Sequence, residues 1–303
     1  MTLHFQHPCW RLMLAASAAT LCGLMFSPPA ADADTLFEAD FNSGNIYQFT
    51  SGGVKSTFAT GLVQPVALAV DSGGNIFEGD YGSNTIYKFT PGGVKSIFAT
   101  GLNRPEGLAF DSSGNLFEAD YSGNAIYKFT PGGVQSTFAT GLNGPIGIAC
   151  DSSGNLFEGD SEGHTINMFT PGGVKSTFAT GVDQVYGLAF GNGGNLFEVA
   201  LNRSNIYEFT PGGVQTIFAT GLVQPACLTS DSSGNLFVGD YGSSAIDKFT
   251  PEGVKSTFAT GIGALGLAIQ SDVASTPEPG AAATLASIAL IGAGFLIRRR
   301  SGR

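Results

Sequence analysis

The hydrophobic and polar positions of this chain repeat with a period of 40 residues. The dipeptide Phe-Thr recurs at that spacing from residues 49–50 to 249–250, and Phe37 and Phe58 each begin a further series with the same period. In the unit at residues 105–142, apolar runs predict four strands, at residues 106–110, 116–119, 125–130 and 134–139. Asp-Ser-Ser-Gly-Asn and Pro-Gly-Gly separate two pairs of these runs, because Asp, Pro and Gly suit tight turns.

Four antiparallel strands in 40 residues are typical of one β-propeller blade. The chain enters mid-blade at residues 36–38, and a lone first strand remains at residues 264–269. We therefore expect an all-β fold, a six-bladed β-propeller over residues 34–270. Its ring would close by pairing of residues 264–269 with the N-terminal partial blade at residues 36–60. The first strands carry small residues at matched positions, Gly or Ala in all but one strand, which predicts close approach of the strands around the axis.

The repeat unit resembles a known propeller motif. From Pro105 to Phe129 it reads Pro-x-Gly-Leu-Ala-x-Asp-x-x-Gly-Asn-Leu-Phe-x-Ala-Asp and then Ile-Tyr-x-Phe, which is similar to the NHL repeat. The resemblance extends to the wider group of NHL, gluconolactonase-like and lyase propellers and covers nearly all of residues 36–270. It implies a six-bladed propeller. That group contains both enzymes and binding modules, so the resemblance does not choose a function.

The N-terminus has the composition of an export signal. Arg11 precedes an apolar run from Leu12 to Phe26, and Ala31-Asp32-Ala33 is a small-residue cleavage sequence. Residues 1–33 are therefore expected to be a secretory signal peptide. The alternative is a retained membrane anchor, for which the apolar run is short.

The C-terminus has the parts of a sorting signal. We expect a linker at residues 271–279, a transmembrane helix at residues 280–297, which carry no charge, and a basic cytoplasmic tail at residues 298–303. The motif residues are Pro277, Glu278, Pro279, Arg298, Arg299 and Arg300. This arrangement resembles the PEP-CTERM signal of Gram-negative bacteria. The resemblance implies an exosortase-type membrane protease as partner, transient inner-membrane anchoring, and then a cell-surface or matrix location. A plain C-terminal anchor is the alternative.

The charge of the chain excludes one class of ligand, and its cysteine positions predict free thiols. The chain has 14 Lys+Arg against 24 Asp+Glu, a net charge of −10, with basic residues clustered only at the C-terminus. Nucleic-acid binding is excluded on this ground, because phosphate contacts need clustered cations. Cys150 and Cys227 remain after removal of the signal peptide and lie in non-neighbouring repeats. We expect two buried free thiols, although the setting is oxidising.

Acidic residues recur at the ends of the second strands. The Asp series is Asp40, Asp80, Asp120, Asp160 and Asp240, and the Glu series, two positions earlier and on the same strand face, is Glu38, Glu78, Glu118, Glu158 and Glu198. Arranged around an axis, these carboxylates would bind Ca²⁺ or another divalent cation, or a cationic ligand. Alternatively, each Asp fixes its own loop and each Glu contacts a neighbouring blade. Buried Glu without basic partners would need a cation or raised pKa values.

Aromatic residues follow several of these acids at the predicted channel mouth. Tyr81, Tyr121 and Tyr241 each follow a series Asp, and Phe41 holds the same position. Aromatic rings beside carboxylates suit stacking on sugars or contact with a protein partner. The alternative is that they only cover the blade tops.

Residues found in one blade only are the candidates for catalysis. At the predicted mouth these are Arg104, Glu106, Asp183, Tyr186, Arg203 and the segment Ser161-Glu162-Gly163-His164. Glu106, His164 and Tyr186 are the candidate catalytic groups, but no nucleophile motif accompanies the histidine. Resemblance to gluconolactonase-like enzymes implies a metal held by Glu, Asn and Asp, for which Glu106 is one match. Resemblance to the lyases implies a mouth histidine, for which His164 is the one match.

The sequence favours a binding or scaffolding module without catalysis, because nearly identical repeats suit a polyvalent surface. Exopolysaccharide or surface proteins are the expected partners. The alternative is a metal-dependent hydrolase or lactonase, or a lyase, of the gluconolactonase-like propeller group.

Overall fold

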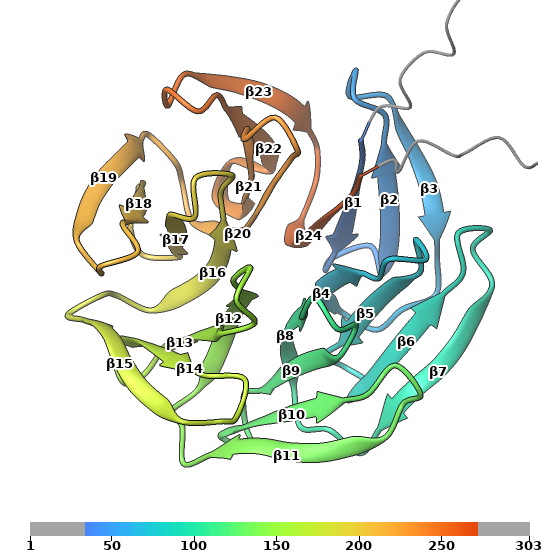
Figure 1. Cartoon of the computed structure of the whole chain (residues 1–303). Coiled ribbons are helices and arrows are strands. Elements are labelled where there is room, and N and C mark those ends of the chain that lie inside the picture. Colours follow the sequence, from blue (N-terminus) through green and yellow to red (C-terminus); the bar gives the residue numbers. More distant parts are fainter. Residues whose placement is uncertain (1–33, 272–303) are drawn as a thin grey trace, which may run out of the picture. The chain divides into compact units, whose positions relative to one another are not determined.

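The computed structural model describes residues 34–271, which form six four-stranded sheets arranged around an axis (Figure 1). Each sheet is one blade. Blade 1 consists of β24 (Ala264–Gln270), β1 (Thr35–Asp40), β2 (Asn45–Phe49) and β3 (Lys55–Ala59). Blade 2 consists of β4 (Pro65–Val70), β5 (Ile76–Asp80), β6 (Thr85–Phe89) and β7 (Lys95–Thr100). Blade 3 consists of β8 (Pro105–Phe110), β9 (Leu116–Asp120), β10 (Ala125–Phe129) and β11 (Gln135–Thr140).

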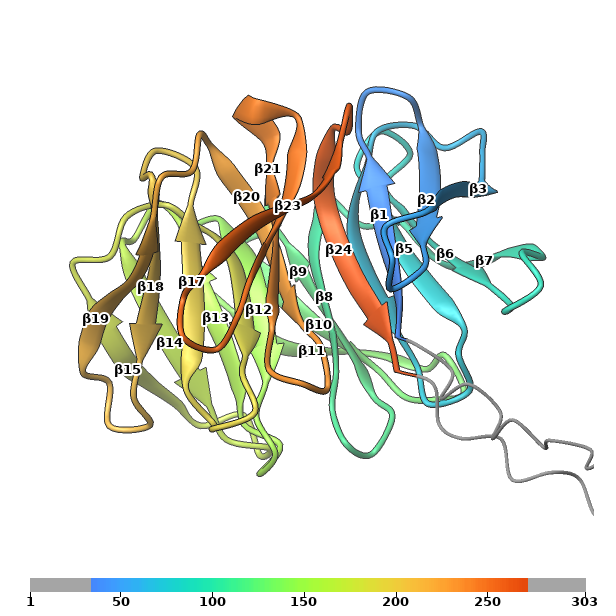
Figure 2. The ribbon, with the colours of Figure 1, turned by 90° about the horizontal axis from the view of Figure 1, so that it is seen from above.

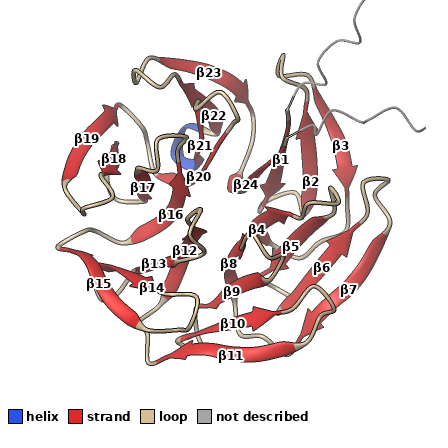
Figure 3. Cartoon of the chain, viewed as in Figure 1, coloured by secondary structure: helices blue, strands red, loops and turns tan. Residues whose placement is uncertain are grey.

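The other three blades repeat this order. Blade 4 consists of β12 (Pro145–Cys150), β13 (Leu156–Asp160), β14 (Thr165–Phe169) and β15 (Lys175–Thr180). Blade 5 consists of β16 (Val185–Phe190), β17 (Leu196–Ala200), β18 (Asn205–Phe209) and β19 (Gln215–Thr220). Blade 6 consists of β20 (Pro225–Ser230), β21 (Leu236–Asp240), β22 (Ala245–Phe249) and β23 (Lys255–Thr260). A 3-10 turn, η1 (Tyr241–Ser243), is the only helical element over the described range (Figure 3). The all-β, six-bladed fold class is confirmed.

Blade 1 joins the two ends of the described chain. β24 pairs antiparallel with β1, with Leu36 opposite Ile269 and Glu38 opposite Leu267 (Figure 2). This is the pairing that the strand count predicts. Each innermost strand also contacts the innermost strand of the next blade, in the order β4, β8, β12, β16, β20 and β24 and back to β4.

Phenylalanines fill the space between blades. Phe58 on β3 lies edge-on to Phe37 of its own blade, with ring centroids 5.1 Å apart, and 5.9 Å from Phe89 of blade 2. The third-strand rings, such as Phe49 and Phe129, are fully buried. The repeating Phe series therefore joins neighbouring blades, which is why an isolated 40-residue unit would leave its apolar faces exposed.

Both ends of the described chain lie on one face of the propeller. Thr35 is opposite Gln270 at the start of β1, and Asp34 accepts the N–H and hydroxyl of Ser232 in the loop between β20 and β21. This face carries the loops between first and second strands and the turns between third and fourth strands. The opposite face, here called the mouth, carries the loops between second and third strands and between fourth and first strands (Figure 2).

Several expectations fall on the chain ends. The predicted signal peptide, transmembrane helix and basic tail, and all but the first residue of the linker, lie outside the described residues. Within residues 34–271, no helix is long and apolar enough to span a bilayer.

Cys150 and Cys227 are both free, but only Cys227 is fully buried. The prediction of two buried thiols is therefore wrong for Cys150, which is half-buried. Burial raises the pKa of the Cys150 thiol to about 12.

Candidate ligand-binding mouth

The Asp series holds the mouth loops together. Oδ1 of Asp80 accepts the N–H of Ser83 at 2.8 Å, and Oδ2 accepts the N–H of Val63 at 2.8 Å. One carboxylate thus joins the loop after β5 to the loop before β4. Asp40 and Asp120 join the same two loops in their blades. Asp160 accepts a backbone N–H only from the loop that follows it, and Asp240 only from the loop before the first strand of its blade. These buried side chains already have donors, so the structure favours their loop-fixing interpretation over that of an open ligand rim.

The Glu series lies between blades and does not surround an open axis. Glu118 on β9 is opposite Leu108 on β8 and Tyr127 on β10, so these side chains share one sheet face. Leu108 and Tyr127 pack against Phe77 and other apolar residues of blade 2. The second strands stand one strand away from the axis, and the first strands occupy the centre. This arrangement favours the alternative in which each Glu contacts a neighbouring blade.

The carboxyl groups of this series are buried almost without partners. Both carboxyl oxygens have no hydrogen-bond partner in Glu38, Glu78, Glu118 and Glu198. Oε2 of Glu158 accepts Nδ2 of Asn167 at 2.9 Å. Burial raises the pKa of Glu38 to about 9, that of Glu198 to about 8 and that of Glu158 to about 7, and it raises those of Glu78 and Glu118 well above their ordinary value. Within residues 34–271, no group of three or more His, Cys, Asp or Glu is placed to hold a metal ion.

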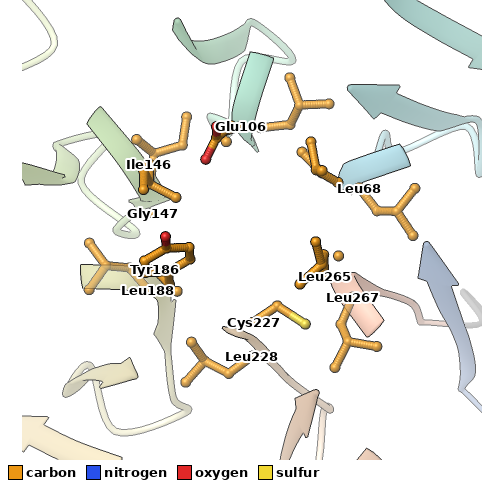
Figure 4. Close-up of a pocket in the computed structure, with 17 residues that line it drawn as sticks. Leu68, Glu106, Ile146, Gly147, Tyr186, Leu188, Cys227, Leu228, Leu265 and Leu267 are labelled. Carbon is orange, nitrogen blue, oxygen red and sulfur yellow. The ribbon is translucent and has the colours of Figure 1, made fainter. Parts of the chain in front are cut away.

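The first strands line a narrow axial channel with a volume of about 70 Å³. Leu, Ile and Gly residues from successive blades line it, and Glu106 and Tyr186 place side-chain oxygen atoms on its wall (Figure 4). Burial raises the pKa of Glu106, while the Arg104 guanidinium opposes that rise. Burial and the nearby Glu106 charge raise the pKa of Tyr186. Two of the three candidate catalytic groups therefore share the channel.

Arg104 is the centre of the interactions at the mouth. Its guanidinium carbon lies 4.3 Å from the ring centroid of Tyr121 and 4.7 Å from that of Tyr81. Its Nη2 donates to Oε1 of Glu106 at 2.7 Å. The backbone of Arg104 has a φ of 67°, and its N–H donates to Oδ1 of Asn84 at 2.9 Å, which fixes this left-handed position. An arginine between two aromatic rings is held by cation–π attraction to both.

The two tyrosines connect Arg104 to residues of two further blades. The rings of Phe41 in blade 1 and Tyr81 in blade 2 lie edge-on, 6.2 Å apart. The hydroxyl of Tyr121 in blade 3 donates to Oε1 of Glu162 in blade 4 at 2.9 Å. We call this connected set the mouth cluster; its members are Phe41, Tyr81, Arg104, Glu106, Tyr121 and Glu162.

Other predicted residues lie outside the mouth cluster. His164 is exposed, and its φ of 55° places it in the turn position held by Asn84 and Asn124 in other blades. Asp183 and Arg203 form an ion pair with each other in blade 5. Tyr241 lies in η1 of blade 6. Sequence reasoning singled out Arg104 and Glu162 as departures from the repeat but missed that both bind the predicted tyrosines.

Comparison with known proteins shows the fold. No protein-family model and no curated protein matches this sequence. Among solved structures, a chain of a nidogen/laminin complex is 21% identical with a TM-score of 0.72, and the match covers 79% of this chain and 100% of that one. Virginiamycin B lyase from Staphylococcus aureus is 18% identical with a TM-score of 0.60, covering 75% of this chain and 81% of the lyase.

A third structure, of a protein proposed to be a gluconolactonase, is 17% identical with a TM-score of 0.64, and the match covers 76% of this chain and 89% of that one. At these identities the similarity shows the architecture alone. The chain is an all-β propeller of six blades, and its structural neighbours include both a binding module and proteins described as enzymes.

Proposed function

We propose that this protein is an exported cell-surface or extracellular-matrix propeller that acts as a binding or scaffolding module through the mouth cluster. The observation that carries the proposal is the placement of the residues that depart from the repeat. Arg104, Glu106 and Glu162 have no counterparts in the other blades, yet they contact one another or the mouth tyrosines. Packing of nearly identical blades does not require such a connected set.

The chemistry of the mouth cluster suits a hydroxyl-rich or protein surface. Tyr81 and Tyr121 are half-exposed, and Glu162 is exposed beside the Tyr121 hydroxyl. Aromatic rings stack on sugar rings and pack against partner side chains, while the carboxylate and hydroxyl accept and donate hydrogen bonds. Exopolysaccharide and surface proteins are therefore the partners that we propose.

The position of the two ends of the propeller is compatible with attachment to a surface. β1 begins and β24 ends on the face opposite the mouth (Figure 2). The uncharged segment at residues 280–297 follows β24 after a short linker. If an exosortase-type system anchors and processes this tail, the mouth cluster faces away from the attachment point.

Binding is tested with exopolysaccharide purified from the producing strain and immobilised on a sensor surface. We expect at least tenfold weaker binding for Arg104→Ala and Tyr121→Ala. Tyr241→Ala in blade 6 is the matched control, because Tyr241 holds the same repeat position outside the mouth cluster. No binding by the wild type, or equal losses in all three variants, would argue against the mouth cluster as the polysaccharide site.

Sorting is tested separately with the full chain in the producing strain. Replacing both Pro277 and Pro279 with Ala is expected to leave the unprocessed protein in the inner-membrane fraction, and Thr276→Ala is the control. An unchanged distribution of the double variant would contradict exosortase-type sorting while leaving the binding proposal intact.

The channel supports a second candidate function, that of a metal-dependent hydrolase or lactonase, or a lyase. Glu106 and Tyr186 bring a carboxyl group and a phenol, both with raised pKa, to the same channel wall, and such groups can transfer protons. Divalent-metal content and lactone hydrolysis are measured for the wild type, Glu106→Gln and Tyr186→Phe. Turnover that both substitutions abolish would support an enzyme, and no turnover by the wild type would remove this candidate.

A further inference from the structure

Three blades hold a lysine ammonium group between a carboxylate and a phenylalanine ring on the face opposite the mouth. In blade 2, Nζ of Lys88 lies 5.0 Å from the Phe77 ring centroid and 3.7 Å from Oδ2 of Asp71. Blade 3 repeats this with Lys128, Phe117 and Asp111 at 5.0 Å and 3.8 Å. Blade 6 repeats it with Lys248, Phe237 and Asp231 at 5.1 Å and 3.9 Å.

Blade 4 keeps the carboxylate and the ring but has no lysine. Asp151 and Phe157 hold the two positions, and Met168 stands where the other blades have lysine. Oδ1 of Asp151 accepts the N–H groups of Ser153 and Asn155 at 2.9 Å and 2.8 Å. These are the same bonds that fix Asp111 in blade 3. The Asp151 carboxylate is therefore held in the same way but lacks a cation beside it.

In blade 5, both the aspartate and the lysine of this arrangement are replaced. There Gly191 replaces the aspartate and Glu208 replaces the lysine, and Oε1 of Glu208 accepts Nδ2 of Asn195 at 2.7 Å. Blade 1 has Gln48 at the lysine position and no loop between its first and second strands, because β24 and β1 are the two ends of the described chain. Over residues 34–271, blade 4 alone has the carboxylate without its lysine.

A groove opens at this position between blades 4 and 5. It has a volume of about 460 Å³ and is lined by Asp151, Phe157, Met168, Phe178 and Phe190, among others. Phe157 lies edge-on to Phe178 and Phe190, with centroids 5.0 Å and 5.1 Å apart.

The equivalent groove between blades 2 and 3 has the same aromatic floor. Phe77 lies 4.9 Å from Phe98 and 5.1 Å from Phe110. Here Lys88 of blade 2 lies over the Phe77 ring, and the groove has a smaller volume of about 250 Å³.

We infer that the groove between blades 4 and 5, here called the amine groove, binds the primary ammonium group of an alkylamine. The Asp151 carboxylate accepts the ammonium N–H, the Phe157 ring faces the positive charge, and Met168 contacts the alkyl chain. The chain's own lysines in blades 2, 3 and 6 show the geometry that such a ligand would adopt. Each interaction is modest at a half-exposed site, so the dissociation constant for a small amine is on the order of 1–10 mM.

The amine groove lies on the face opposite the mouth cluster, so its test is independent of the proposed function. The full chain is titrated at low salt with n-butylammonium chloride, with n-butanol as the uncharged control, and followed by NMR. We expect saturable shifts of the Phe157 and Met168 signals with the amine only. Nα-acetyl-lysine methylamide, titrated in parallel, shows whether the groove also accepts a lysine side chain of a peptide.

Three variants decide the assignment. Asp151→Asn is expected to weaken amine binding at least tenfold. Met168→Lys is expected to abolish it, because the new side chain would occupy the groove as Lys88 does in blade 2. Lys88→Met is expected to create a second saturable site, at Phe77. Folding of each variant is checked by its amide spectrum. Equal responses to amine and butanol in the wild type, or undiminished binding by folded Asp151→Asn or Met168→Lys, would overturn the assignment.

Discussion

Besides the aspartate that ends the second strand, blades 3 and 6 each bury a carboxyl group in the middle of the sheet, but they hold it differently. In blade 3, Glu118 on β9 lies opposite Tyr127, and neither of its carboxyl oxygens has a partner. In blade 6, Val238 takes the place of the glutamate and Asp247 that of the tyrosine. Oδ2 of Asp247 lies 2.8 Å from Nζ of Lys255, and its Oδ1 accepts the Thr257 hydroxyl at 3.2 Å.

The comparison shows how moving a carboxyl group from the second to the third strand changes the partners that it can reach. A carboxyl group on the second strand is enclosed between blades, and burial with the nearby Asp120 charge raises the pKa of Glu118. A carboxyl group on the third strand reaches the fourth strand, where a lysine can pair with it. Blade 3 has Gln135 at the position of Lys255. Both carboxyl groups are buried, so the two blades differ in whether a basic partner lies within reach of the carboxyl group.

The largest expected effect is a fall in stability as the pH rises. The five buried glutamates bind protons more tightly in the folded than in the unfolded chain. Between pH 4.5 and each folded pKa, the unfolded state has released a proton that the folded state keeps. Each glutamate in its window therefore removes about 1.4 kcal/mol of unfolding free energy per pH unit.

Urea unfolding at pH 5, 7 and 9 checks this prediction. Stability is expected to be highest at pH 5, and Glu118→Gln is expected to reduce the slope because it removes one titrating group. Stability that stays level or increases toward pH 9 would show that these glutamates do not carry protons in the folded state.

The second-largest effect on stability is expected from removing the lysine that pairs with Asp247 in blade 6. Lys255→Met would leave Asp247 buried without its cation, at a cost of about 2 kcal/mol of unfolding free energy at pH 7. Gln135→Met is the control, because it changes the same repeat position in blade 3, where no paired aspartate is present. Urea unfolding measures both, and equal losses would mean that the ion pair with Asp247 contributes nothing.

The smallest effect is expected from giving blade 3 the lysine that other blades have. Lys55, Lys95 and Lys175 oppose the rise in the pKa of the glutamates in blades 1, 2 and 4. Gln135→Lys is therefore expected to lower the pKa of Glu118 and to raise stability by less than about 1 kcal/mol at pH 9, with no gain at pH 5. A gain of equal size at both pH values would show that the lysine acts through packing.

The sequence predicted the fold closely because its signals are local and repeated. Turn residues such as Asp111 and Pro131 begin each reversal, and the Phe series marks the strand faces that pack between blades. The same reasoning left two arrangements open for the Glu series, around a shared cation or against the neighbouring blades. Period-2 alternation gives the face of a strand, but it does not say whether that face is directed at the axis or at the neighbouring blade.

The amino-acid sequence by itself determined the blade, the number of blades and the strand that closes blade 1, because these follow from a pattern written six times in 40-residue steps. Only the tertiary structure decided which departures from that pattern meet. Tyr81, Arg104 and Glu162 come from three different blades, and they are connected because ring geometry brings neighbouring mouth loops together. The empty lysine position at Met168 likewise becomes a candidate site only because blade 5 supplies the other wall of its groove.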